Sequence, residues 1–116
     1  MRHNPPVMTP TWDEFERLRL TVGTVVAVEE FPEARVPAWK LTIDFGPLGV
    51  KRSSAQVTSY SREALLGRQV VCVLGFEPKR IASFESEVLV LGAISQENDV
   101  ILLRPDRPVE DGSPVA

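Results

Sequence analysis

The chain has 116 residues, of which 43% are apolar and 25% charged, and its formal net charge is −3 at pH 7. This length fits a single domain with one core, and the composition is ordinary for a soluble globular protein. The slight acidity argues against indiscriminate binding of nucleic acid, and no apolar stretch is long enough to predict a membrane-spanning helix.

Residues 1–11 carry three of the ten prolines and no hydrophobic periodicity, so we expect a flexible leader without a secretory signal. The folded domain is expected over residues 12–116. Thr11 can cap a short helix that places Trp12 and Phe15 on one face. A helix this short does not stand alone, so that face should pack onto a sheet or a partner chain.

Three strands are predicted next, over residues 19–31, 39–46 and 50–58, because polar and apolar side chains alternate there. The first strand contains Gly23, which suggests a bulge or bend. Two sets of side chains are each expected to share one face: Leu20, Val22, Thr24, Val26 and Val28 on the first strand, and Trp39, Leu41, Ile43 and Phe45 on the second.

Ser61 resembles a helix cap, and a short helix is expected from there to Gly67. The β-branched run at 69–76 predicts a fourth strand that is buried on both faces, with Cys72 as a core residue rather than a reactive thiol. A fifth strand is expected over about 87–94, followed by a turn and a further strand. The proline-rich tail can lie only along an edge.

These elements predict an all-β protein with the order of the OB fold, a five-stranded Greek-key barrel. It has a short N-terminal helix and a short helix between strands three and four. An SH3-like barrel and a small sandwich are the all-β alternatives, but the second helix favours the OB fold. The exposed face and loops of OB folds commonly bind oligonucleotides.

No pattern for catalysis, a metal ion or a cofactor is found in the sequence. His3 is the only histidine, and there is neither a Cys/His cluster nor a glycine-rich phosphate loop. Glu85 and Glu87 lie two residues apart on one face of a strand, which is more typical of solvated than of catalytic carboxylates. A single cysteine excludes an internal disulfide and fits a reducing compartment, so a cytoplasmic location without membrane insertion is expected.

The basic residues are concentrated in the middle of the chain, where the segment 35–80 carries eight basic and three acidic residues. This segment can build a local positive face on an acidic protein, unless its charges are scattered in space. On the third strand, Arg52 and Ser53 point to opposite sides, so only one of them can face a given ligand. Lys79 and Arg80 follow the fourth strand, and such cations contact phosphates.

Three sequence pieces are the most specific: FPEARVPAWKLTIDFG at 31–46, SSAQ at 53–56 and SEVLVLG at 86–92. On the basis of these pieces, residues 12–116 resemble the CsaA-type branch of the tRNA-binding domain family. The resemblance implies an OB-fold domain that holds the outer corner of tRNA by shape rather than by sequence. Members of this branch are described as homodimers and as secretion-related chaperones that bind peptides and preproteins.

The family signature around the binding loop is roughly N-L-x-P-[RK]-[KR] followed by S-x-G-M. Pro78, Lys79, Arg80 and Ser86 match it, whereas Gly75 replaces the asparagine, and Val88 and Leu89 replace the Gly-Met pair. The resemblance therefore implies five candidate tRNA-binding residues, which are Arg52, Ser53, Lys79, Arg80 and Ser86.

Three functional hypotheses follow. The first is non-catalytic binding of folded tRNA by a homodimer whose interface contains Trp12 and Phe15. The second is a peptide- or preprotein-binding chaperone that uses Phe76, Phe84 and Leu89 on the same barrel face. The third is a scaffold that only dimerises and recruits other proteins.

Overall fold

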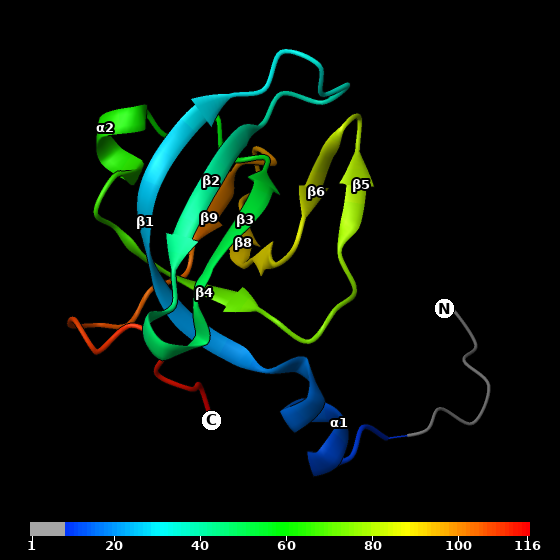
Figure 1. Cartoon of the computed structure of the whole chain (residues 1–116), viewed down its shortest axis with the longest axis vertical. Coiled ribbons are helices and arrows are strands. Elements are labelled where there is room, and N and C mark those ends of the chain that lie inside the picture. The colour runs from blue at the N-terminus through cyan, green and yellow to red at the C-terminus, as the bar shows by residue number, and fades with distance from the viewer. Residues whose placement is uncertain (1–8) are drawn as a thin grey trace.

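Five antiparallel strands curl into a nearly closed barrel in the computed structural model, which describes residues 9–116 (Figure 1). Their order in the sheet is β3–β2–β1–β4–β7. The strands are β1 (Leu20–Glu30), β2 (Trp39–Asp44), β3 (Val50–Ala55), β4 (Gln69–Val73) and β7 (Leu89–Val90). The predictions for His3 and for most of the leader at 1–11 lie outside the described residues.

The barrel closes between β3 and the segment that leads into β7. The amide of Glu87 donates to the carbonyl of Arg52 at 2.8 Å, and the hydroxyl of Ser53 donates to the carbonyl of Val88 at 2.8 Å. These bonds replace a regular strand ladder at the seam. The predicted five-stranded all-β barrel with the strand order of an OB fold is thereby confirmed.

Both predicted helices are present. Helix α1 (Trp12–Leu18) starts with a capping box, in which Thr11 and Glu14 each accept a hydrogen bond from the other's backbone amide. Helix α2 (Arg62–Leu65) joins β3 to β4 and starts at Ser61, whose hydroxyl accepts from a backbone amide of the helix. No helix within residues 9–116 is long and apolar enough to cross a membrane.

The alternation predicted for β1 is wrong in its second half. A bulge between Val25 and Ala27 shifts the register against β2, so Val25 is fully buried and Val26 is 49% exposed. The bulge does not lie at Gly23. That glycine instead leaves room for core side chains over β1, because a Cβ atom there would lie 2.7 Å from the side chains of Ile43 and Phe45.

The core lies inside the barrel and follows the predicted face of β2, where Leu41, Ile43 and Phe45 are fully buried. Cys72 on β4 is also fully buried, and this burial raises the pKa of its thiol to about 12. The prediction of a core cysteine is therefore confirmed. A short 3₁₀ turn (Gly46–Leu48) connects β2 to β3.

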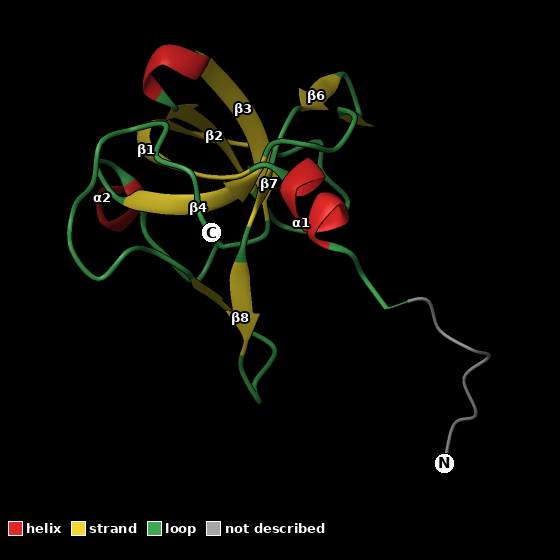
Figure 2. Cartoon of the chain, turned by 90° about the horizontal axis from the view of Figure 1, so that it is seen from below, coloured by secondary structure: helices red, strands yellow, loops and turns green. Residues whose placement is uncertain are grey.

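The second half of the chain departs most from the predicted strands. The fourth strand ends at Val73 rather than at residue 76, and the expected loop after it contains a hairpin of β5 (Lys79–Ile81) and β6 (Phe84–Ser86). The fifth strand is divided at Leu91, and Gly92, which follows, lies so close to β9 that a side chain has no room there. Beyond it, β8 (Gly92–Ile94) leaves the barrel sheet (Figure 2) and pairs with β9 (Val100–Leu102).

The C-terminal tail lies along the first residues of β1, on the side where β2 does not pair with them. Val22 accepts from the amide of Gly112 at 2.8 Å and donates to the carbonyl of Ser113 at 2.9 Å. The amide of Val115 donates to the carbonyl of Leu20 at 2.9 Å. The tail and α1 consequently lie at the same end of the barrel (Figure 1).

Candidate nucleic-acid interface

Two loops meet at the end of the barrel opposite α1 (Figure 1). One joins β1 to β2 and covers residues 31–38, and the other is the β5–β6 hairpin. Phe31 and Phe84 bring them into contact through tilted rings whose centroids are 5.4 Å apart. Ala38 completes this small buried cluster, against which Ile81 packs. The equivalent loops of an OB fold flank its oligonucleotide-binding face.

Two cations from neighbouring strands cover these rings. The Nζ atom of Lys40 on β2 lies 4.9 Å from the ring centroid of Phe31 and 5.5 Å from that of Phe84. The guanidinium of Arg52 on β3 lies 4.5 Å from the ring centroid of Phe84. Positive charge therefore gathers at the junction of the two loops, held there by cation–π contacts.

Carboxylates lie among these cations, and that of Glu29 pairs with one of them. The Nη2 atom of Arg52 lies 3.0 Å from Oε1 of Glu29, in the only ion pair formed within residues 9–116. Both side chains are well exposed, so the pair contributes little to stability. It nevertheless occupies part of the guanidinium that the sequence predicted for phosphate binding.

The hairpin cations are exposed but point to opposite sides. Lys79 and Arg80 are consecutive residues of β5, so their side chains alternate. Lys79 lies opposite Ser86 and faces a groove on the barrel side of the hairpin. Arg80 lies opposite Glu85, away from that groove. Both predicted cations therefore belong to the loop junction, on two different surfaces of it.

The two predicted serines bind protein groups instead of facing solvent freely. Ser53 is only 1% exposed and its hydroxyl is used in the barrel seam. The hydroxyl of Ser86 accepts from the amide of Ser54 at 3.0 Å and approaches the carbonyl of Val88 at 3.5 Å. These hydroxyls fasten the base of the hairpin to β3. The predicted alternation is confirmed, because Ser53 is buried and Arg52 is exposed.

The groove on the barrel side of the hairpin has a volume of about 600 Å³ and a mostly apolar lining. Phe76 and Leu89 line it and are 51% and 47% exposed, so two of the predicted peptide contacts lie together. Phe84 does not join them, because it is 5% exposed and lies beneath Lys40 and Arg52. The groove therefore offers an apolar surface with Lys79 at its side.

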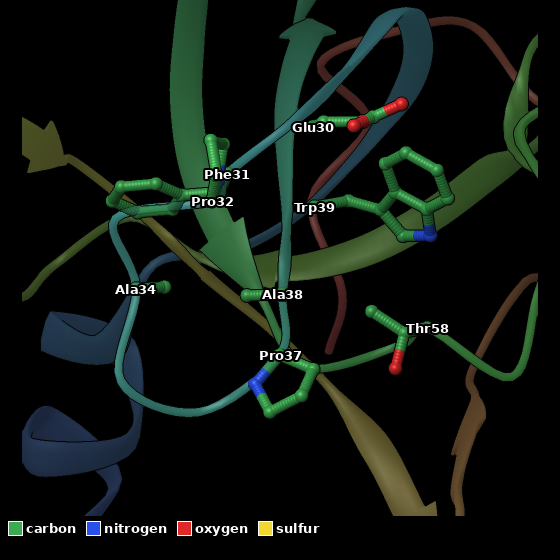
Figure 3. Close-up of a pocket in the computed structure, with 8 residues that line it drawn as sticks. All are labelled: Glu30, Phe31, Pro32, Ala34, Pro37, Ala38, Trp39 and Thr58. Carbon is green, nitrogen blue, oxygen red and sulfur yellow. The ribbon is translucent and has the colours of Figure 1, made fainter.

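A smaller hollow of about 320 Å³ lies beneath the 31–38 loop (Figure 3). Trp39 and Thr58 lie on one side of it, and Pro32 lies on the other. The indole of Trp39 is fixed by donating to the carbonyl of Tyr60 at 3.1 Å. The alternation pattern assigned this indole to the interior, and it does pack against the core, but the pattern gave no sign of the hollow on its other side. Its one ionisable lining group is a carboxylate, which does not suit phosphate.

The predicted interface residues lie at the other end of the molecule. Trp12 is 85% exposed, and together with the half-buried Phe15 it lines a groove of about 610 Å³. Leu48 and Pro114 also line it, so α1, the 3₁₀ turn and the tail share one mostly apolar surface. No cluster of three metal-binding side chains occurs anywhere in the described chain.

Comparison with known proteins supports the family resemblance. A family model described as a putative tRNA binding domain matches residues 20–114. The CsaA chaperone of Bacillus anthracis str. Ames is 49% identical, with a TM-score of 0.87 over 94% of this chain and 100% of that one. The CsaA chaperone protein of Picrophilus torridus is 44% identical, with a TM-score of 0.88 over 93% of this chain and 100% of that one.

The chain is also similar to part of a class of much longer proteins. The methionine–tRNA ligase of Methanosphaerula palustris is 33% identical over 103 residues, which are 89% of this chain but 15% of the ligase. The chain thus spans about 15% of the length of the curated relatives it matches. Because the family model covers most of the sequence and the barrel matches those of the CsaA proteins, the chain belongs to the putative tRNA-binding domain family.

Proposed function

We propose that this chain binds folded tRNA without catalysing a reaction, and that it recognises the shape and the charged backbone of the RNA. The observation that carries this proposal is that three exposed cations, Arg52, Lys79 and Arg80, surround the junction of the two OB-fold loops, on more than one of its surfaces. Membership of the putative tRNA-binding domain family supports it independently.

Backbone recognition is favoured over base stacking because the rings at the junction are covered. Phe31 and Phe84 are 6% and 5% exposed, and two cations lie over them. Proteins that bind unpaired bases present open aromatic faces, whereas folded RNA is held through phosphates and riboses. We infer that the guanidinium and ammonium groups contact phosphates.

The two serines have a supporting role in this account. Ser53 and Ser86 bind backbone groups of the barrel seam, and in this way they fix the hairpin that carries Lys79 and Arg80. Direct contact between Ser86 and the RNA backbone remains a prediction, as does any contact made by Ser53.

The test is binding of a fluorescently labelled folded tRNA to the wild type and to a Lys79→Ala/Arg80→Ala variant. We expect the variant to lose at least about ten-fold in affinity at about 50 mM salt, because two phosphate contacts are removed. The matched control is Arg104→Ala/Arg107→Ala, which removes two exposed cations from the segment after β9 and should bind like the wild type. Equal losses in both variants would contradict a specific site.

We further infer that the protein pairs as a homodimer through α1 and the C-terminal tail. The apolar groove around Trp12 lies at the end of the barrel opposite the loop junction, so two-fold pairing there leaves both junctions open to RNA. The buried free thiol of Cys72 is in keeping with a reducing compartment, and we place the protein in the cytoplasm.

A second candidate function is chaperone-like binding of extended peptides, and the apolar groove beside the hairpin supports it. Phe76 and Leu89 offer exposed apolar contacts there, and the similar CsaA proteins are named chaperones. This function predicts suppression of client aggregation that is weakly dependent on salt and is reduced by Leu89→Ser. Unchanged aggregation in the presence of the protein would exclude it.

A further inference from the structure

Three charged side chains from adjacent strands lie on one face of the sheet beside the loop junction. They are Glu29 on β1, Lys40 on β2 and Arg52 on β3. Glu29 lies directly opposite Lys40 in the strand register, yet its carboxylate pairs with Arg52 at 3.0 Å. Lys40 forms no ion pair in the described part of the chain.

The two cations therefore differ in what they can still offer to a ligand. The guanidinium of Arg52 is stacked on Phe84 and donates to Glu29. Lys40 is held over Phe31 and Phe84, and none of its three donors is used in a hydrogen bond within residues 9–116. A positioned ammonium with unused donors is ready to bind phosphate, whereas a paired guanidinium must first be released.

We propose that Lys40 is a phosphate-binding residue of this face, and that Glu29 limits the affinity by holding Arg52. This inference rests on the proposed function, because it assigns roles within the same RNA site. It makes opposite predictions for Lys40 and Glu29, which lie opposite each other on β2 and β1. Loss of the lysine charge weakens binding, and loss of the glutamate charge strengthens it.

The variants are chosen to change charge while keeping the packing. Lys40→Gln retains most of the stem over the rings, and Lys40→Arg retains the charge as a rescue. Glu29→Gln is nearly isosteric and releases Arg52. The matched control is Lys51→Gln, which removes a lysine from the opposite side of β3, and thermal unfolding of every variant confirms that the barrel is intact.

Binding of labelled folded tRNA is measured for each variant at about 50 and about 200 mM salt. We expect Lys40→Gln to weaken binding about five- to ten-fold and to reduce the logarithmic salt slope by about one. Lys40→Arg should restore both. Glu29→Gln should tighten binding about three-fold or more and steepen the slope, because a carboxylate is removed and a second cation reaches the RNA.

Each outcome separates this inference from the proposed function. If the wild type binds tRNA but Lys40→Gln behaves like Lys51→Gln, Lys40 is not a phosphate contact and the inference is overturned. If Glu29→Gln weakens binding, the carboxylate supports the site instead of limiting it, which also overturns the inference. Failure of the wild type to bind at low salt overturns the proposed function itself.

Discussion

Phe31 and Phe84 belong to two different loops, and their rings pack with centroids 5.4 Å apart under the side chains of Lys40 and Arg52. This contact makes one surface out of the β1–β2 loop and the β5–β6 hairpin. The hairpin is held to β3 at its base through Ser86, and the ring contact fixes its outer end, so the position of Lys79 and Arg80 depends on both attachments.

Phe84→Ala should therefore affect both stability and binding. The buried ring leaves a cavity, and we expect a loss of about 3 kcal/mol in the free energy of unfolding. Affinity for tRNA should also fall, since the hairpin is no longer fixed. Urea unfolding and tRNA binding measure the two effects. Phe76→Ala, at a half-exposed phenylalanine, should change the free energy of unfolding by less than about 1 kcal/mol. A loss as large as that of Phe84→Ala would contradict the special role of the contact between Phe31 and Phe84.

Gly23→Ala should destabilise the barrel although it adds only a methyl group. The new Cβ atom would lie 2.7 Å from the side chains of Ile43 and Phe45, which are fully buried and have no room to move. We expect a loss of about 1–3 kcal/mol by chemical denaturation. Val26→Ala, at an exposed position of the same strand, is the control. A stable Gly23→Ala variant would show that β1 and β2 separate more easily than this packing implies.

Cys72 should make stability fall at alkaline pH. Burial raises its pKa from 9.0 to about 12, so the folded protein holds the thiol proton more tightly than the unfolded chain. This contribution to stability is complete below about pH 9 and is lost as the pH rises towards 12. The free energy of unfolding of the wild type should therefore fall more steeply over this range than that of Cys72→Ala, in which the titration is absent.

The same burial should protect Cys72 from modification. A thiol reagent such as Ellman's reagent reacts with the thiolate, so the native protein should react very slowly at neutral pH and the urea-unfolded protein quickly. Fast reaction of the native protein would show that β4 opens readily.

Trp12→Glu should abolish dimerisation without unfolding the barrel. The side chain is 85% exposed and contributes nothing to the core, while a charge at this position is incompatible with an apolar interface. Light scattering at micromolar concentration should give the mass of a dimer for the wild type and of a monomer for the variant. Ile94→Glu, at an exposed residue of β8, should remain dimeric. A monomeric wild type would refute the dimer.

The fold could be predicted well wherever a strand follows simple alternation. Residues 39–46 show this, because each apolar position of β2 faces the core. The bulge between Val25 and Ala27 could not be foreseen, since it depends on how β1 meets two neighbours rather than on the local sequence. The hairpin strands escaped detection because three residues are too few to show a period.

The sequence predicted which cations belong to the candidate site, but not how they are arranged. Lys79, Arg80 and Arg52 followed from the family signature and from the local charge. The burial of Phe84, the pairing of Arg52 with Glu29 and the position of Lys40 all depend on contacts between distant segments. Such contacts are set by strand register, which one sequence without its relatives does not reveal.

The most direct test of tRNA binding through phosphates is the salt dependence of the wild-type affinity for folded tRNA. With at least three phosphate contacts from the cations of the loop junction, the affinity should fall about 20-fold or more between about 50 and about 200 mM salt. That result would support electrostatic docking on the loop junction. Measurable binding with a flat salt response, or no binding at low salt, would contradict it.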